Sequence, residues 1–438
     1  MMIDTLIQEI KKGFSSVKEH RYKNAQKPLD DYLQSAYAMF HLKDPSLHHY
    51  RLNYAERSAN LERIYAIKNL SSDTALREGI DGIDPKDIQE VFKIPLQVLE
   101  KEGIINEYKV LGGLGGLGGY NCILFDGTEN YCSSTNPCEH CLTKVHRNKK
   151  GEVTQTTYHH QSLAGVMAHY DNKEVFPVAC EAIVKQDGET KNDCELNAAK
   201  RLLPIVRGML PEDRYNLLGV FDGLYPNGPL IRLINDLKMR FVIGIQEGYV
   251  LVQVEKLKRE KALKQHEWMN EKGEKCVAQY HNALILNGSN QDIEVNYFEY
   301  EQFNSKGVRT FHNTWITDFF INNDNIEELV KIGRSRWKIE NETFNTLKNQ
   351  GYHLEHSYGH GKKYLTTNLM LLTFLAFLTD QIAQRLDKAF DKALKYCKTK
   401  KRLWEKVRQI FDLLPCMSMN VIYRFIAREV VIDFPLLE

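Results

Sequence analysis

The sequence predicts an α/β domain with a mixed central sheet, preceded by a helical region, interrupted by a mostly β insertion and followed by further helices. Three observations predict this class. Apolar residues recur at helical spacing over residues 1–108, compact β-prone runs alternate with helical segments over residues 120–246, and β-prone stretches dominate residues 247–310. The middle part has the order strand, strand, strand, helix, strand, helix, strand, which is typical of an α/β domain.

Size and charge set the limits for function. The chain has 438 residues, which is long enough for two or three packed units. Its formal net charge of +1 gives no global basic field, but residues 385–408 hold ten Lys or Arg against three Asp or Glu. Such a helical surface either binds a polyanion or is simply a solvated face.

Neither a membrane span nor a disulfide framework is expected. Residues 1–12 alternate apolar and charged side chains, unlike a signal peptide. The most apolar stretch, residues 365–378, is interrupted by Thr and Asn and falls short of the roughly 20 apolar residues that a span requires, so it predicts a buried helix. Nine irregularly spaced cysteines indicate a reducing, cytoplasmic compartment.

Residues 1–111 are predicted to form a helical N-terminal domain. Ser72 and Asp84 are expected to begin helices, the latter with Pro85 at the first helical position. The domain either binds DNA or serves as a packing unit. The glycine-rich run over residues 112–119 lacks the Gly-Lys-Ser/Thr of a phosphate loop and precedes a strand, so it is interpreted as a hinge.

Residues 112–246 are predicted to form the first part of the α/β core, with buried strands and two helices. The expected strands cover residues 120–125, 163–167, 174–179, 216–221 and 239–245, and the expected helices cover residues 195–206 and 229–237. Polar residues fill 181–195, which either line a groove or form an exposed loop.

The remaining chain divides into three predicted parts. Residues 247–312 form the β-rich insertion, 313–365 the last part of the core, and 366–438 a C-terminal helical region. Within the second of these, a strand over residues 314–321 precedes a long helix. Asn325, with Glu328 three residues later, indicates a variant of the capping box at the start of that helix.

Three carboxylates stand out as candidate catalytic residues. Asp126 and Asp222 each follow a predicted buried strand, although each Asp-Gly pair is also compatible with a simple turn. Glu340 lies on the late helix, four residues after Arg336 and therefore on the same face. Carboxylates from two strands and a helix can hold two divalent ions about 4 Å apart, and hard oxygen ligands suit Mg²⁺ or Mn²⁺. The planar guanidinium of Arg336 would bind phosphate.

At these residues the chain resembles a known family. Asp126-Gly127-Thr128 after a strand, Asp222 at a second strand end, and Arg-Trp-x-Ile-Glu over residues 336–340 are similar to bacterial insertion-sequence DDE transposases that carry a β insertion before the glutamate. The resemblance covers roughly residues 30–380. It implies an RNase H-like core, metal-dependent cleavage and strand transfer of transposon ends into target DNA, and a homo-oligomer assembled on DNA at the bacterial nucleoid. Cleavage through a hairpin intermediate is a further expectation from the resemblance.

The match on the late helix is incomplete. The family pattern places a tyrosine where Gly333 stands and a lysine where Leu347 stands, with Lys348 one residue late. Lys348 is nevertheless expected to contact phosphate. The missing tyrosine leaves its phosphate contact, and with it hairpin chemistry, open.

Glu342 is the alternative to Glu340 as the third ligand. On an α-helix, residues two apart face about 200° differently, so only one of these glutamates can bind the metal. The four-residue spacing from Arg336 favours Glu340. Trp337, next to this arginine, is expected to pack in the core.

A second metal is suggested by Cys138 and Cys141. They form a CxxC pair near Cys132, His146, His159 and His160. Zinc could be bound there, but the sequence does not give clear spacing for a second pair of ligands. Two other functions remain open beside the transposase: a catalytically silent, transposase-derived DNA-binding protein and an RNase H-like nuclease.

Overall fold

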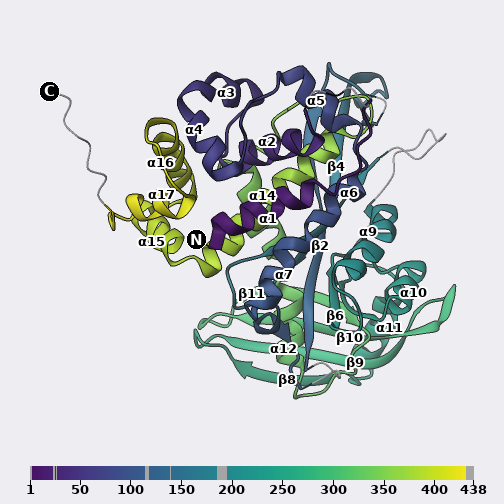
Figure 1. The fold of residues 1–438 in the computed structure, drawn as a ribbon. Coiled ribbons are helices and arrows are strands. Elements are labelled where there is room, and N and C mark those ends of the chain that lie inside the picture. The colour runs from purple at the N-terminus through teal and green to yellow at the C-terminus, as the bar shows by residue number, and fades with distance from the viewer. Residues whose placement is uncertain are drawn as a thin grey trace.

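The computed structural model describes residues 2–22, 25, 27–113, 118–138, 140–184 and 195–430. Part of the predicted glycine-rich hinge, residues 114–117, and most of the predicted polar segment, residues 185–194, lie outside these described residues. The described chain is a mixed α/β structure built around one open sheet with helices packed beside it (Figure 1).

Five strands form the centre of the sheet. In spatial order they are β5 (Phe176–Ile183), β4 (Val153–Met167), β2 (Tyr120–Ser133), β6 (Leu217–Phe221) and β7 (Met239–Gly244). The strands β2, β4 and β5 pair antiparallel, whereas β6 and β7 run parallel to β2. The short β6 is buried along its whole length, as expected for a strand covered on both faces.

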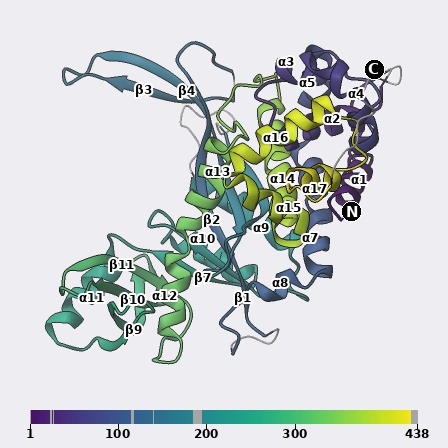
Figure 2. The same cartoon turned by 90° about the vertical axis from the view of Figure 1, so that its left-hand side faces the viewer.

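Two further strands extend this centre. β1 (Lys109–Val110) pairs with the start of β2, and β3 (Leu142–Arg147) pairs with the first half of β4. The β3–β4 hairpin projects from the body of the molecule (Figure 2). Because β3 and β5 pair with successive parts of β4, the long strand β4 links the hairpin directly to the buried centre.

Two helices connect the central strands. Helix α9 (Glu195–Met209) contacts β4 and β5, and α10 (Gly228–Asp236) contacts β7 and α9. Asn227 begins α10 by accepting a hydrogen bond from the backbone N–H of Leu230 at 3.3 Å. The predicted strands and helices in this part of the chain are therefore confirmed in their order, with β3 as an additional strand that was not predicted.

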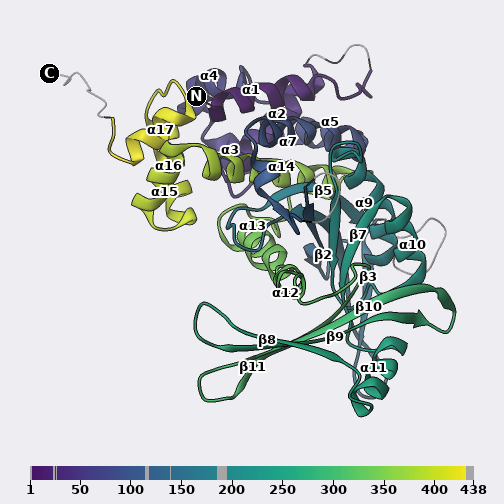
Figure 3. The same cartoon turned by 90° about the horizontal axis from the view of Figure 1, so that it is seen from below.

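The insertion extends the same sheet. It begins with helix α11 (Tyr249–Arg259) and continues through β8 (Lys264–Met269), β9 (Lys275–Asn287), β10 (Asn290–Phe303) and β11 (Arg309–Thr317). These strands form long antiparallel ribbons (Figure 3), and β11 pairs with β7 of the centre. The predicted strand over residues 314–321 thus starts earlier and ends at Thr317.

The late helical segment is not one continuous α-helix. It consists of α12 (Ile326–Arg334), a π-helical turn (Ile339–Phe344) and α13 (Asn345–Asn349). The predicted capping box was wrong. Asn325 accepts instead from the backbone N–H of Asn322 at 3.0 Å, and Glu328 accepts from the N–H of Leu111 at 2.8 Å and from the hydroxyl of Tyr170 at 3.0 Å. These two longer-range hydrogen bonds replace the local contact.

Helices from both ends of the chain pack together. The N-terminal set is α1 (Met2–Phe14), α2 (Leu29–His41), α3 (Leu47–Leu52), α4 (Tyr54–Tyr65), α5 (Asp73–Asp81), α6 (Pro85–Val91), α7 (Lys93–Lys101) and α8 (Ile104–Glu107); the C-terminal set is α14 (Leu365–Leu386), α15 (Lys388–Cys397), α16 (Lys400–Leu413) and α17 (Met419–Ile426). Helix α14 runs between them and contacts α2, α5, α6 and β5 (Figure 1). The predicted caps are confirmed, since Ser72 accepts from Ala75 and Asp84 from Lys86.

Helix α14 is the buried helix predicted from its apolar sequence. Among the described helices it alone is long and apolar enough to cross a membrane, but 89% of its most apolar window is buried inside the molecule. That burial is the property of a core helix. The basic stretch of the sequence falls on the following helices, α15 and α16, where Lys392, Lys395, Lys401 and Arg402 are exposed.

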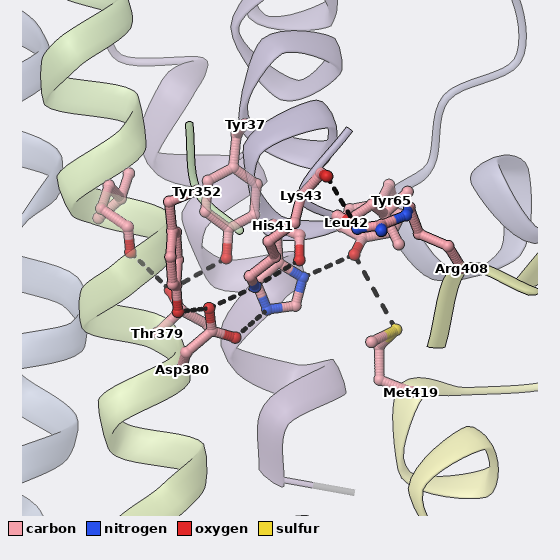
Figure 4. A network of polar contacts seen from close by, with 11 residues as sticks. Tyr37, His41, Leu42, Lys43, Tyr65, Tyr352, Thr379, Asp380, Arg408 and Met419 are labelled. Carbon is pink, nitrogen blue, oxygen red and sulfur yellow. Dashed lines mark hydrogen bonds and ion pairs between the residues drawn. The ribbon is translucent and has the colours of Figure 1, made fainter. Parts of the chain in front are cut away.

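A buried polar network joins the two helical sets (Figure 4). Lys43, just after α2, forms an ion pair with Asp380 of α14, and both side chains are almost completely buried. Asp380 also accepts from the hydroxyl of Tyr352 at 2.5 Å, and Tyr37 donates to Thr379 at 3.0 Å. The N-terminal helices are therefore tied to α14 and to the segment that follows α13.

Candidate active site on the mixed sheet

Asp126 lies inside a strand and not at its end. The structure extends β2 to Ser133, and Asp126 pairs with Ala164 of β4. The predicted strand end after Phe125 was therefore wrong, because the residues beyond Asp126 continue to pair with β4. The Asp126 side chain is 14% exposed.

Asp222 follows the last residue of β6, as predicted. Its neighbour in the sheet is β2, with Leu124 level with Val220 in the parallel register. Continuing that register by two residues brings Asp126 level with Asp222, on strands about 4.8 Å apart. Asp222 also accepts a hydrogen bond from the backbone N–H of Leu224 at 2.8 Å, which fixes the carboxylate at the strand end.

Arg336 and Glu340, in the late helical segment, lie beside Asp126. The guanidinium of Arg336 donates to Asp126 at 2.8 Å and to Glu340 at 2.6 Å. The structure therefore brings together Asp126, Arg336 and Glu340. Glu342 instead acts on Lys338. Burial lowers the pKa of Lys338, and the negative charge of Glu342 partly offsets this shift.

The cluster carries more negative than positive charge. The pKa of Asp126 is raised to about 7, mainly by burial; Arg336 lowers it, and the negative charges of Glu340, Asp222 and Glu195 act in the same direction as burial. A carboxylate surrounded by like charges is stabilised by a cation. The carboxylates offer the oxygen donors that a hard divalent ion prefers. Among the described residues, however, Asp126, Asp222 and Glu340 do not form a group whose ligand atoms all lie within 4.8 Å of one another.

Glu195 is a fourth carboxylate that the sequence interpretation did not assign to the site. It is the first residue of α9, and it accepts a hydrogen bond from the hydroxyl of Tyr225 at 3.1 Å. Burial raises its pKa, and the charge of Asp222 adds to the effect. A Cβ on Gly127 would lie 2.4 Å from Oε1 of Glu195, so the glycine after Asp126 leaves room for this carboxylate.

Lys348 and Trp337 are two more residues of the late helical segment. Lys348 forms an ion pair with Glu355 at 2.9 Å, and its phosphate contact stays a prediction. Trp337 is 46% exposed, so its predicted core packing was wrong; the residue lies where α12 gives way to the π-helical turn. It lines a cavity of about 500 Å³ together with Trp268 and Lys331, between α12 and the insertion.

The CxxC pair gathers partners from distant parts of the chain. Cys138 and Cys141 lie within 4.8 Å of ligand atoms of His160 and His360. Of the other predicted neighbours, His159 is hydrogen-bonded to Glu129 at 2.5 Å and lies in a separate group with Cys132. His146 contacts Thr157 at 2.9 Å. No spacing in the sequence links His360 to this cysteine pair.

A scan against protein-family models and a search of curated proteins found no match to this chain. Arg336 contacts Asp126 and Glu340 directly, and the charge of Asp222 also acts on it.

Proposed function

We propose that this protein is a DDE-type transposase that cuts transposon ends and joins them to target DNA. The observation that carries the proposal is the convergence of Asp126 and Glu340 on Arg336, with Asp222 following the parallel neighbour strand and its charge acting on Asp126. Three carboxylates from two strands and a helical segment form the ligand set that two-metal phosphoryl transfer requires.

The strand order supports an RNase H-like core. Three antiparallel strands, β2, β4 and β5, are followed by β6 and β7 parallel to β2, in the spatial order β5-β4-β2-β6-β7. This is the arrangement of RNase H-like sheets. Helices α9 and α10 occupy the two connections that the arrangement needs, and the β insertion follows β7.

The carboxylates and the arginine of the site would have different roles. Asp126, Asp222 and Glu340 bind Mg²⁺ or Mn²⁺, which activates the attacking water or 3′-hydroxyl and stabilises the leaving oxygen when bound. Arg336 neutralises two of the ligands in the metal-free protein. In a complex with DNA, the planar guanidinium group of Arg336 would instead bind the reacting phosphate.

Two surfaces suit the DNA partner. The cavity beside Trp337 is lined by Trp268 and Trp337 together with four acidic and four basic side chains, so its aromatic rings and not its net charge would favour a single strand by stacking. Helices α15 and α16 expose further cations, of which Lys392 and Lys395 are paired with Glu429 and Asp391. We expect a homo-oligomer on transposon ends and a place at the nucleoid in the bacterial cytoplasm.

The experiment is cleavage of a DNA fragment that carries the element's own terminal repeats. The full chain is assayed with Mg²⁺ and with EDTA, together with Asp126→Ala, Asp222→Asn and Glu340→Gln. We expect metal-dependent cleavage at the repeats, and a loss of about 10²-fold or more in each variant while DNA binding is retained. Glu342→Gln is the matched control, because the same chemical change lies two residues away, outside the cluster.

Other outcomes would assign a different function. Binding of the repeats without cleavage by the wild-type protein would indicate a silent, transposase-derived DNA-binding protein. Cleavage of RNA–DNA hybrids or branched DNA without repeats would indicate an RNase H-like nuclease. Cleavage that survives Asp126→Ala would contradict the proposed site, as would a greater loss in Glu342→Gln than in Glu340→Gln.

A further inference from the structure

Four side chains outside the acidic cluster meet beside the long strand β4. Cys138 and Cys141 lie in the loop between β2 and β3, His160 lies on β4, and His360 precedes α14. The sulfurs of the two cysteines are 3.4 Å apart, and Nε2 of His160 lies 3.3 Å from one and 3.4 Å from the other. The cysteines are free thiols, well beyond the roughly 2.05 Å of a disulfide bond.

These three distances describe the face of a tetrahedron. Zinc binds thiolate sulfur at about 2.3 Å and imidazole nitrogen at about 2.0–2.1 Å, which places ligand atoms of a tetrahedral site about 3.4–3.8 Å from one another. An imidazole nitrogen without a metal carries one hydrogen or one lone pair, and so cannot form a full hydrogen bond to each of two sulfurs. A common central ion accounts for all three contacts.

His360 supplies the fourth vertex. Its Nε2 is buried and has no hydrogen-bond partner among the described residues, although buried polar atoms are normally satisfied. The rings of His360 and His160 lie 5.1 Å apart and nearly perpendicular, while Tyr131 packs edge-on against His360 at 4.2 Å. The flanking Gly359 and Gly361 have φ values of 116° and 68°, so the backbone turns sharply on both sides of this histidine.

The CxxC loop is also arranged for thiolates. The backbone N–H of Cys141 donates to the carbonyl of Cys138 at 3.1 Å and closes a turn. The N–H of Cys138 in turn donates to the sulfur of Cys141 at 3.3 Å. Such hydrogen bonds orient metal-binding sulfurs and stabilise their negative charge.

A neighbouring group is a weaker candidate. Glu129, Cys132 and His159 also lie close together. Both ring nitrogens of His159 are already engaged, one with Glu129 at 2.5 Å and the other with Thr157 at 2.7 Å. The group therefore has a complete set of contacts without a metal.

We propose that Cys138, Cys141, His160 and His360 bind a structural zinc ion. Two thiolates and two imidazoles favour zinc over the hard cations expected at the acidic cluster. Four protein ligands leave no open position, which is the property of a structural and not a catalytic site. The ion joins the loop after β2 to the segment between α13 and α14, and thereby holds the far end of the strand that carries Asp126.

The first test is the metal content of the full chain, purified without chelators and measured by mass spectrometry. We expect about one zinc ion per chain for wild type and less than about a tenth of that for His360→Ala. Cobalt-substituted protein should give the visible absorption of a tetrahedral, thiolate-bound ion, and His360→Ala should lose that spectrum. His159→Ala, the neighbouring histidine on β4, is the matched control and should keep the zinc.

A second variant separates metal loss from misfolding. His360→Cys replaces one zinc ligand by another, so it should restore the zinc content that His360→Ala loses. The proposal is overturned if the wild-type chain neither contains zinc nor takes it up from added Zn²⁺. Zinc that stays in a folded His360→Ala protein, or that is lost in His159→Ala alone, would equally overturn the assignment of these four ligands.

Discussion

Arg336 donates to the carboxylate of Asp126 at 2.8 Å, although the two residues are 210 positions apart in the chain. The same guanidinium reaches Glu340 at 2.6 Å. One arginine therefore holds two of the proposed metal ligands together. In the proposed reaction its role would be different, since a metal ion and a phosphate would both compete for these contacts.

Removing this arginine should separate metal binding from catalysis. In Arg336→Ala, we expect Mn²⁺ to bind at least as tightly as in wild type, because a competing positive charge is lost. DNA cleavage should fall by about 10²-fold, because the reacting phosphate loses its partner. Calorimetric Mn²⁺ titration and the cleavage assay measure the two effects. Arg336→Ala that loses Mn²⁺ binding as completely as Asp126→Ala would contradict this division of roles.

The pKa of Asp126 predicts how stability depends on pH. Burial raises it from 3.8 to about 7, so its favourable contribution to folding is fully present below about pH 4 and is lost as the pH rises through about 7. In EDTA, Asp126→Asn should therefore be more stable than wild type at pH 8, by on the order of 1–2 kcal/mol, because the variant no longer buries a charge. Arg336 loses a charged partner in the variant, which limits the gain.

Thermal unfolding at pH 5 and pH 8 provides the measurement. The advantage of Asp126→Asn should shrink at pH 5, where the wild-type carboxyl is protonated. Added Mg²⁺ should reverse the order at pH 8 by stabilising wild type more than the variant. A variant that is less stable than wild type at both pH values in EDTA would contradict the prediction.

The sequence predicted the acidic residues better than their surroundings. Asp222 was correctly expected after a buried strand, because the apolar run and the strand end at the same residue. Asp126 was expected at a strand end as well, but its strand continues to Ser133 because β4 supplies pairing partners beyond it. Long-range pairing thus overrides the local turn preference of Asp-Gly.

Contacts between distant segments could not be predicted from local patterns. Glu195 enters the cluster only because α9 docks on the sheet, and His360 reaches the cysteines only because the segment before α14 folds back toward β4. The angular argument between Glu340 and Glu342 assumed an α-helix, whereas these residues lie in a π-helical turn with different spacing. Trp337 is exposed at the start of the same irregular segment, where the α-helical pattern used for its prediction does not apply.

Gly127 tests whether Glu195 contributes to the cluster. In Gly127→Ala, the new Cβ would meet Oε1 and Cδ of Glu195 at 2.4 and 2.7 Å, so this flexible side chain must move. We expect the fold to be retained, with metal affinity and cleavage reduced about tenfold. Gly208→Ala, in α9 with open space around its Cβ, is the control and should leave both unchanged. Equal behaviour of the two variants would indicate that Glu195 has no role in metal binding.

The buried pair of Lys43 and Asp380 should be essential for stability. Lys43→Met leaves Asp380 charged and buried without its main partner, which costs about 3–5 kcal/mol in the free energy of unfolding. Combining Lys43→Met with Asp380→Leu removes both charges, so the double variant should recover much of that loss. Lys392→Met is the control, because its partner Glu429 is at the surface and such pairs contribute about 0–1 kcal/mol.

Urea unfolding followed by circular dichroism distinguishes these expectations. The two single variants and the double variant form a cycle whose coupling energy reports the pair itself. If Lys43→Met costs no more than Lys392→Met, the pair does not hold α2 against α14. If the double variant is instead less stable than Lys43→Met, the hydrogen bond from Tyr352 to Asp380 at 2.5 Å must contribute more than the ion pair, because only Asp380→Leu removes it.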